Sequence, residues 1–419
     1  MHAVSNQASH SPNPGKGWFI GLMSGTSLDG VDAVLARFSP SLGGHAGLEC
    51  IAVAGHVHIP LGEPLVALLR QLNFPGHDEL HLAALAENAL AHCYANAVKQ
   101  LCEQTGIPAS SILAIGAHGQ TVRHQPAPRQ APDAVLAGLG QPSDGLGRYT
   151  IQLNNPSLLA EHTGIRVVAD FRRRDVAAGG QGAPLVPAFH RAMFGQPGQG
   201  VAVLNLGGIA NWSLIDAEGR TLGFDSGPAN TLLDGWCQLH TGAPYDKGGQ
   251  WAASGKVHGG LLMHLLLEGY FSLPAPKSTG VDVFSQTWLH NQLQQCASQQ
   301  APDAAPWSAA DVQASLLELT AISVAQAFAR YQQGQRSVGV CGGGAHNTLL
   351  MQRIEHHLQL AVGETVEVVS TAAWGLPPEQ VEAAAFAWLA RQCLLGMPGN
   401  VPAATQAKGP RVLGAIYHA

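Results

Sequence analysis

Apolar positions near the start of the chain lie on both sides of a short polar turn. An apolar run, Phe19–Met23, leads into the small and polar residues Ser24–Gly30, and apolar positions return in Val31–Leu35. Apolar segments around a glycine-containing turn are typical of two paired β-strands. We therefore predict strand, turn and strand within Trp18–Phe38, although an ordinary glycine-rich hairpin has the same composition.

The same pattern occurs again in the middle of the chain. Val201–Leu206 is apolar, Gly207–Asn211 is a turn of small residues, and apolar positions follow it. All buried hairpins share this outline, but two similar units in one chain indicate a duplicated core. A further short strand, Val338–Cys341, runs into the turn Gly342–Gly344, after which we expect a helix from Ala345 onward.

Other segments complete the pattern of an α/β protein. Short apolar runs predict buried strands at Ile112–Ile115 and Val167–Ala169. Apolar residues at helical spacing, with capping residues or prolines at their ends, predict long helices. These helices are Asp78–Thr105 with Asp78 as N-cap, one starting near Pro184, one near Pro228, Ser308–Gln333 with Ser308 as cap, and Glu379–Leu395.

The first turn has the composition of an anion site. Gly25 and Gly30 allow positive φ and a close approach of the backbone to a ligand, and the hydroxyls between them are donors. Asp29 and Asp32 add carboxylates that suit Mg²⁺ held through its water shell. A helix after Gly342–Gly344 offers a second anion site at its N-terminus.

Two common phosphate motifs do not fit. A P-loop is excluded because no G-x-x-x-x-G-K-[ST] sequence occurs. The segment around Gly342 has part of a dinucleotide fingerprint, but Asn347 stands where the third glycine belongs, and no first βαβ unit precedes it.

Length and composition narrow the function classes. With 419 residues the chain is long enough for two domains. Only 12% of residues are charged and the net charge is −6, which gives no basic field for nucleic acid or an anionic membrane. The 7 cysteines are odd in number and form no C-x-x-C pair, which argues against a disulfide framework or a zinc site and indicates a cytoplasmic protein.

Two segments lack the pattern of a packed core. Residues 1–17 are polar and contain no apolar stretch of signal-peptide length, so we predict a disordered extension. Gln125–Tyr149 is rich in Pro, Gly and Ala and is predicted to be an inserted surface loop. No apolar run approaches ~18 residues, so no membrane span is predicted.

Six motifs occur in one order along nearly the whole chain from Trp18. They are Phe19–Asp32, Ala117–Thr121, Asp170–Asp175 with Gly179–Pro184, Gly223–Asn230, Pro276–Gly280 and Cys341–Gly344. Together they resemble the anhydro-N-acetylmuramic acid kinase family. The resemblance implies the two-lobed α/β fold of actin, the acetate and sugar kinases and the heat-shock chaperone ATPases, with a duplicated core and a central cleft.

The resemblance also implies a reaction. ATP, with Mg²⁺, would phosphorylate a 1,6-anhydro amino sugar while water opens its anhydro bridge, and the product would be N-acetylmuramic acid 6-phosphate, in cell-wall recycling. The partners would be this small sugar and ATP, in a homodimer, without nucleic acid or membrane. We expect the first lobe at 18–195 plus 379–419 and the second lobe at 196–378.

The site residues follow from the same motifs. Asp225 is expected to be the catalytic base, with Glu382 near the reacting sugar, and Thr121, Arg174 and Asp225 at the substrate. The nucleotide would contact Gly25, Thr26, Ser27, Leu28, Asp29, Gly30, Val31, Asp32, Gly207, Gly208, Asn211, Gly342, Gly343 and Gly344.

Several alternatives stay open on the sequence alone. Asp225 precedes a predicted helix, where Asp is also a common N-cap. His118 has the choice of facing the sugar or bonding to its own turn, and Lys277 is a further candidate for a contact with the substrate or between lobes. At the level of the whole chain, the alternative is an actin- or chaperone-like nucleotide switch without sugar turnover.

Overall fold

The structure is a computed structural model, and it describes residues 17–25, 27–40, 47–126, 147–280, 283–299 and 306–419. Thr26, most of the predicted loop Gln125–Tyr149, and all but the last residue of the predicted extension 1–17 lie outside the described residues.

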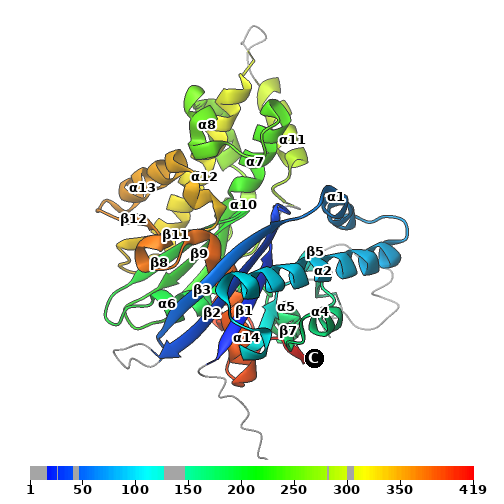
Figure 1. Cartoon of the computed structure of the whole chain (residues 1–419). Helices are drawn as coiled ribbons and strands as arrows, with labels where there is room; N and C mark the ends of the chain where they lie inside the picture. The colour runs from blue at the N-terminus through cyan, green and yellow to red at the C-terminus, as the bar shows by residue number, and fades with distance from the viewer. Residues whose placement is uncertain (1–16, 26, 41–46, 127–146, 281–282, 300–305) are drawn as a thin grey trace, which may run out of the picture.

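Two mixed β-sheets form the centre of the protein (Figure 1). The first has the order β13-β7-β4-β1-β2-β3 and the second the order β10-β9-β8-β11-β12. The strands of the first are β1 (Trp18–Ser24), β2 (Gly30–Pro40), β3 (Glu49–Pro60), β4 (Ile112–Ala117), β7 (Val167–Ala169) and β13 (Ala415–Tyr417). Those of the second are β8 (Val201–Leu206), β9 (Ile209–Ile215), β10 (Thr221–Pro228), β11 (Ser337–Cys341) and β12 (Glu367–Ser370).

The two sheets repeat one topology. In each, the first strand of a hairpin (β1 or β8) pairs antiparallel with the next strand and parallel with a later one (β4 or β11). The spatial order β3-β2-β1-β4-β7 in the first sheet corresponds to β10-β9-β8-β11-β12 in the second. The predicted duplicated core and the two-lobed actin-like α/β fold are therefore confirmed.

Helices lie on the faces of the sheets and at the far end of the second lobe. They are α1 (Glu63–Leu72), α2 (Glu79–Thr105), α4 (Pro156–Thr163), α5 (Phe171–Ala177), α6 (Val186–Phe194), α7 (Asn230–Thr241), α8 (Gln250–Ser254), α9 (Gly259–Leu266), α10 (Gly269–Ser272), α11 (Gln286–Ser298), α12 (Ala309–Tyr331), α13 (Thr348–Val362), α14 (Val381–Leu394) and α15 (Pro402–Thr405). A separate hairpin, β5 (Gln120–Gln125) with β6 (Tyr149–Leu153), follows β4.

Helix α12 is the core helix of the second lobe. Ser308, the predicted cap, forms a capping box with Asp311 at its start. The helix packs against α7, α8, α9 and α13. It is the one helix among the described residues that is long and apolar enough to cross a membrane, but 78% of the relevant window is buried inside the protein. Its apolar surface is therefore satisfied by the core.

Helix α14 crosses from the end of the second sheet to the first sheet. It packs on β1, β2 and β4, and Figure 1 shows it beside these strands despite its late position in the chain. The approach is close because β1 and β4 each have a glycine there. A Cβ on Gly21 would overlap the backbone of Ala383, and a Cβ on Gly116 would overlap that of Phe386.

Some predicted boundaries differ from the structure. The expected helix after Gly344 begins only at Thr348, because Asn347 accepts a hydrogen bond from the N–H of Leu350 as N-cap. Asp78 does precede α2 but has left-handed φ and makes no side-chain cap. The helix predicted near Pro228 begins at Asn230, so Asp225 lies inside β10.

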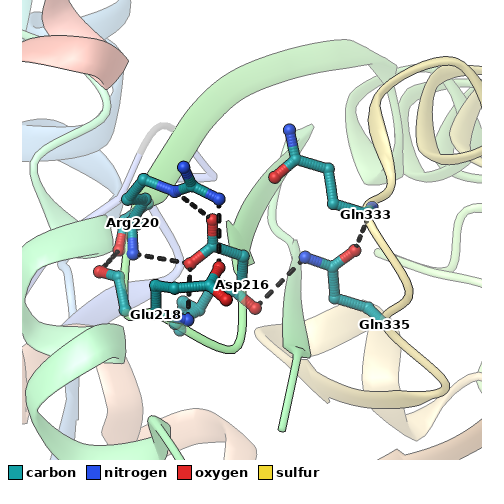
Figure 2. A network of polar contacts seen from close by, with 8 residues as sticks. Asp216, Glu218, Arg220, Gln333 and Gln335 are labelled. Atoms are coloured by element: carbon teal, nitrogen blue, oxygen red, sulfur yellow. Dashed lines mark hydrogen bonds and ion pairs between the residues drawn. The ribbon is translucent and has the colours of Figure 1, made fainter. Parts of the chain in front are cut away.

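A polar network fixes the far end of the β9–β10 hairpin (Figure 2). Asp216 accepts hydrogen bonds from the backbone N–H groups of Glu218 and Arg220 and pairs with the Arg220 side chain. Gln335 donates to the carbonyl of Ile215 at 3.1 Å, which ties the segment before β11 to this turn. The network anchors the strand that delivers Asp225.

Candidate active site

The first turn connects β1 to β2. Its left-handed residue is Leu28, with φ 59°, whereas Gly25 and Gly30 are not in that region, so the expected positive φ at the two glycines is wrong. The Leu28 side chain is buried in the core of the first lobe, which holds the strained backbone in place. Gly30 is required for space, because a Cβ there would overlap the His58 ring.

Acidic side chains surround this turn. Asp29 is exposed and accepts a hydrogen bond from the Ser27 hydroxyl at 2.5 Å. One oxygen of Asp32 contacts His56 Nε2 at 3.0 Å and His58 Nδ1 at 3.1 Å, both from β3. The neighbouring Val31 is buried in β2.

The second turn and the Gly342–Gly344 turn lie against each other. Gly342 has φ 80°, and a Cβ on it would come within 2.8 Å of the Leu206 carbonyl oxygen. A Cβ on Gly344 would meet Leu206 Cβ at 2.6 Å. The start of α7 donates backbone hydrogen bonds to the carbonyls of Gly207 and Gly208. Two of the three predicted phosphate-binding segments are thus brought together. At Gly343, by contrast, a Cβ would fit beside Asn230 without overlap.

Helix α7 also connects this region to the first turn. Burial, followed by the nearby charges of Asp29 and Asp246, raises the pKa of Asp234 to about 7. Asp29 follows β1 of the first sheet, whereas Asp234 lies on α7, which follows β10 of the second sheet. The charge of the first turn therefore acts on α7.

Asp225 lies on the last part of β10 and does not cap a helix. It pairs in register with Asn211, which pairs in turn with Asn205 on β8. Its carboxylate accepts hydrogen bonds from the Ser278 hydroxyl at 3.0 Å and the Thr279 N–H at 2.9 Å. Burial raises the pKa of Asp225 to about 6, although these hydrogen bonds and the charges of Arg172 and Lys277 lower it.

Glu382, in the first turn of α14, lies beside the row of register partners Asn205, Asn211 and Asp225. Asn205 Nδ2 donates to Glu382 Oε1 at 3.3 Å. Burial raises the pKa of Glu382; the charge of Arg172 lowers it, and that of Asp32 raises it. The side chains of Asn205, Asn211 and Asp225 share one face of the sheet because they are register partners, so Glu382 meets this row at Asn205.

Besides Asp225, the predicted substrate residues are Arg174 and Thr121, which lie on α5 and β5. Arg174 is on α5 and exposed, whereas Arg172, on the same helix, is the arginine whose charge acts on Asp225 and Glu382. Thr121, on β5, accepts a hydrogen bond from Gln152 of β6 at 3.1 Å. Its role at the substrate stays a prediction.

Lys277 has a structural role in the second lobe. Its Nζ donates to the carbonyls of Tyr270 and Phe271 and lies 4.3 Å from the centre of the Tyr270 ring. Burial lowers its pKa to about 8. The Lys277 ammonium is thus bonded to groups of the second lobe.

Sequence reasoning missed three side chains that complete this region: Arg172, Asn205 and Asp234. Asn205 lies in the middle of an apolar strand, and that single polar position was the available signal. Asp234 lies on the polar side of an ordinary helix pattern, and consecutive arginines do not reveal which one turns inward.

Comparison with known proteins gives one family. The family model described as "Anhydro-N-acetylmuramic acid kinase" matches residues 17–419. A protein of that name from Variovorax paradoxus is 53% identical over 406 residues, covering 96% of this chain and 99% of the relative. One from Bordetella petrii is 51% identical over 402 residues, covering 96% of each.

Solved structures with similar folds are more distant. An activator of 2-hydroxyisocaproyl-CoA dehydratase from Clostridium difficile, with bound ADPNP, is 13% identical, with TM-score 0.39, covering 90% of this chain and 94% of the other. A ROK family glucokinase from Streptomyces griseus, with glucose and AMPPNP, is 14% identical, with TM-score 0.38, covering 90% and 100%.

Proposed function

The chain belongs to the anhydro-N-acetylmuramic acid kinase family and is a phosphotransferase of peptidoglycan recycling, and we propose that Asp225 is the general base of its reaction. Because the family is one of kinases, we set aside the alternative of a nucleotide switch without sugar turnover. The observation that carries the proposal is the environment of Asp225: a buried carboxylate, oriented by two hydrogen bonds, with a pKa near 6.

The proposed chemistry uses these properties in sequence. The carboxylate of Asp225 takes a proton from a water molecule, whose oxygen attacks C1 of the 1,6-anhydro sugar. The bond between C1 and O6 breaks, and O6 takes the γ-phosphoryl group of ATP, with ADP leaving. A base with a pKa near 6 is largely ionised at neutral pH yet retains useful basicity. Ser278 and Thr279 hold the carboxylate in one orientation.

We place the polyphosphate of ATP between the two hairpin turns and Gly342–Gly344. Contact between the second turn and the glycine turn supports this position, as does the effect of the Asp29 charge on Asp234. We retain Glu382 beside the reacting sugar, and Arg174 and Thr121 as sugar contacts.

We propose Mg²⁺ as the partner of ATP. Asp29, Asp32 and Asp234 supply oxygen donors, and burial followed by the charges of Asp29 and Asp246 raises the pKa of Asp234. Among the described residues no three His, Cys, Asp or Glu side chains are placed to enclose a metal directly. Mg²⁺ is usually held by one or two carboxylates and phosphates and keeps several waters, and here it would neutralise phosphate charge.

We further propose a cytoplasmic homodimer. The seven cysteines are all free thiols, which supports a reducing compartment, and the dimer rests on the family resemblance. The lobe division at 18–195 plus 379–419 and 196–378 is supported by α14 packing on the first sheet and by β13 pairing with β7.

The test is Asp225→Asn, assayed for sugar phosphorylation and for ATP binding. We expect turnover to fall by ~10²-fold or more while ATP binding is retained, because the amide keeps the shape but not the basicity. Asp216→Asn is the matched control, since Asp216 is a buried carboxylate bonded to backbone N–H groups at the far end of the hairpin (Figure 2). Near-normal turnover in Asp225→Asn would remove Asp225 as the base.

A further inference from the structure

Asn205 is a polar residue in an otherwise apolar strand. It lies in β8 between Leu204 and Leu206, and every residue of this strand is buried. Only 4% of Asn205 is exposed. Burying an amide costs free energy unless its polar atoms are hydrogen-bonded. An amide at this position therefore needs bonded partners, and the partners that it has are elements of the proposed active site.

The alternation of the strand directs Asn205 toward helix α14. Leu204 and Leu206 belong to the core cluster of the second lobe, whereas Val203, two residues before Asn205, packs in the cluster that includes α14. Residues i and i+2 of a strand lie on the same face of a sheet. Asn205 is therefore on the face that meets α14, and its Nδ2 donates to Glu382 Oε1 at 3.3 Å.

Two neighbours of different character fix the orientation of the amide. Cys341, the register partner of Asn205 on β11, donates from Sγ to Asn205 Oδ1 at 3.7 Å. Burial raises the pKa of this thiol well above its usual range, so the thiol keeps its proton. An ionised carboxylate only accepts hydrogen bonds, so Glu382 requires the NH₂ group. Both neighbours thus demand the same orientation, with Oδ1 toward Cys341 and Nδ2 toward Glu382.

The same amide lies against the glycine turn. A Cβ on Gly342 would come within 2.5 Å of Asn205 Oδ1, so the chain passes the amide here only as glycine. The Gly342 N–H donates to the carbonyl of Pro378 at 3.1 Å, shortly before α14 begins. Asn205 is therefore enclosed between the turn proposed to contact phosphate and the helix that carries Glu382.

Glu382 uses one of its two oxygens for this contact. Among the described residues, the bond from Asn205 to Oε1 is the one hydrogen bond that the Glu382 carboxylate makes. The other oxygen, Oε2, is available to a sugar hydroxyl, which is a hydrogen-bond donor. A carboxylate held at one oxygen presents the other in a defined direction, which favours binding and reaction of a substrate in one pose.

We propose that Asn205 is a positioning residue: its amide holds the Glu382 carboxylate beside the Gly342 turn, oriented to accept a hydrogen bond from a hydroxyl of the sugar. This inference rests on the proposed place of Glu382 at the reacting sugar. The Gly342 turn has its own bond to Pro378, so ATP binding depends less on the amide than the sugar does.

The experiment is the kinetics of Asn205→Leu, a substitution of similar size that removes both bonds of the amide. We expect kcat/KM for the anhydro sugar to fall at least ~10-fold, because the carboxylate loses its fixed direction. The Kd for ATP, measured by calorimetry without sugar, should stay within about twofold of wild type. An unchanged kcat/KM for the sugar, or a larger loss in ATP affinity than in kcat/KM, overturns the proposal.

A double variant tests whether Asn205 acts through Glu382. Asn205→Leu should cause little further loss in a Glu382→Ala background, because residues that act as one unit have non-additive effects. Losses that multiply would show that Asn205 acts elsewhere and would overturn the proposal.

Ser213→Ala is the matched control for removing a buried polar group from this sheet. Ser213 lies on β9, is fully buried and is bonded to His190 of α6 at 2.8 Å. We expect this variant to keep the wild-type kcat/KM for the sugar. A loss as large as that of Asn205→Leu would mean that any polar deletion in the sheet disturbs turnover, and the specific role of Asn205 would fall.

Thermal unfolding shows whether Asn205→Leu keeps the fold. If it does not, Asn205→Ala takes its place, because this substitution removes the amide without adding bulk beside Gly342. The same loss in kcat/KM for the sugar is expected, and a wild-type value in Asn205→Ala overturns the proposal.

The outcome is distinguishable from a failure of the proposed function. Near-normal turnover in Asp225→Asn would remove the base, whereas the expected losses in Asn205→Leu would still support the role of Asn205. Wild-type kinetics in Glu382→Ala would remove Glu382 from the sugar and end the role of Asn205 with it. A large loss in Glu382→Ala together with wild-type kinetics in Asn205→Leu would overturn the role of Asn205 alone.

Discussion

At the scale of single residues, burial decides the chemistry of Asp225 more than its hydrogen bonds do. Two good donors and two nearby positive charges lower its pKa, yet desolvation keeps it near 6. A buried carboxylate that must ionise is a stability cost retained for function.

The first residue-scale prediction concerns stability. The pKa of Asp225 is about 6 in the fold and 3.8 in the reference state. Its folded form therefore holds its proton more tightly, so this stabilising contribution is present below about pH 4 and is lost as pH rises through about 6. Asp225→Asn should raise Tm at pH 8 and increase the free energy of unfolding by at most about 3 kcal/mol. This gain should vanish near pH 4. Calorimetry at both values checks this, and an unstable variant at pH 8 would contradict it.

A pair of glycines in the first turn gives the second prediction. Among the described residues, a Cβ on Gly25 would come within 4 Å of Ser27 Oγ alone, at 3.5 Å, whereas a Cβ on Gly30 would overlap His58. We expect Gly25→Ala to keep its Tm but to weaken ATP binding at least ~10-fold, since the backbone must approach phosphate. Gly30→Ala should lower stability by about 1–3 kcal/mol. Calorimetric ATP titration and thermal unfolding measure the two effects. Wild-type ATP affinity in Gly25→Ala would place the phosphates elsewhere.

At the scale of elements, a partly buried ion cluster joins α12 to α13, the helix after the glycine turn. Glu318 on α12 pairs with Arg353 at 2.5 Å and His357 at 2.6 Å on α13. Burial raises the pKa of Glu318, but the hydrogen bonds from these two residues outweigh it, and the net shift is downward. The cluster thereby fixes α13, and with it the turn proposed to contact ATP.

This cluster predicts a stability difference between two glutamates. Glu318→Gln should destabilise the protein by about 1–3 kcal/mol at pH 7, because it leaves the partly buried Arg353 guanidinium without its charged partner. Glu364→Gln is the control, because its pair with Arg336 is exposed and should contribute less than about 1 kcal/mol. Since the pKa of Glu318 is lowered by folding, its contribution is present above about pH 4.5 and is lost at more acidic pH. Denaturant unfolding at pH 7 should rank the two variants, and equal losses would refute the assignment.

At the scale of the whole molecule, the duplicated topology brings carboxylates of different halves together. Asp225 comes from the second sheet, whereas Glu382 comes from α14, which packs on the first. The hydrogen bond from Asn205 to Glu382 joins the second sheet to α14. The proposed reaction needs both halves, because the base, the sugar contacts and the phosphate turns are divided between them.

The reaction as a whole predicts a stereochemical result. One carboxylate that activates water implies direct displacement at C1 and therefore inversion, whereas a covalent sugar intermediate requires a second carboxylate at ~5–5.5 Å and gives retention. The anhydro bridge holds C1 in the β configuration, so the first product should be the α anomer. Heavy-oxygen water should label C1 and leave the phosphoryl oxygens unlabelled.

Proton NMR before mutarotation gives the anomer, and mass spectrometry locates the label. A β product would indicate a nucleophilic carboxylate such as Glu382. Label in the phosphoryl group would mean that water attacks ATP, and the coupling proposed here would be wrong.

The sequence by itself determined the elements and the family. The two hairpins, the core helix at Ser308–Gln333 and the motifs around Asp225 depend on local apolar periodicity, caps and glycine turns, which neighbouring residues set. Two local predictions were wrong. Asn347 caps a helix that begins three residues later than expected, and Leu28 takes the left-handed φ expected of glycine because its side chain is buried in the core.

Only the tertiary structure decided which side chains meet. Three adjacent arginines are equivalent in sequence, and in the fold Arg172 is the one that donates hydrogen bonds to His118 and to the Gly182 carbonyl. In the sequence alone, Asp225 suited a helix N-cap equally well. In the fold it lies in β10 and accepts hydrogen bonds from Ser278 and Thr279. Burial and charge contacts join segments far apart in the chain, so they depend on how the two sheets and α14 pack and not on any local pattern.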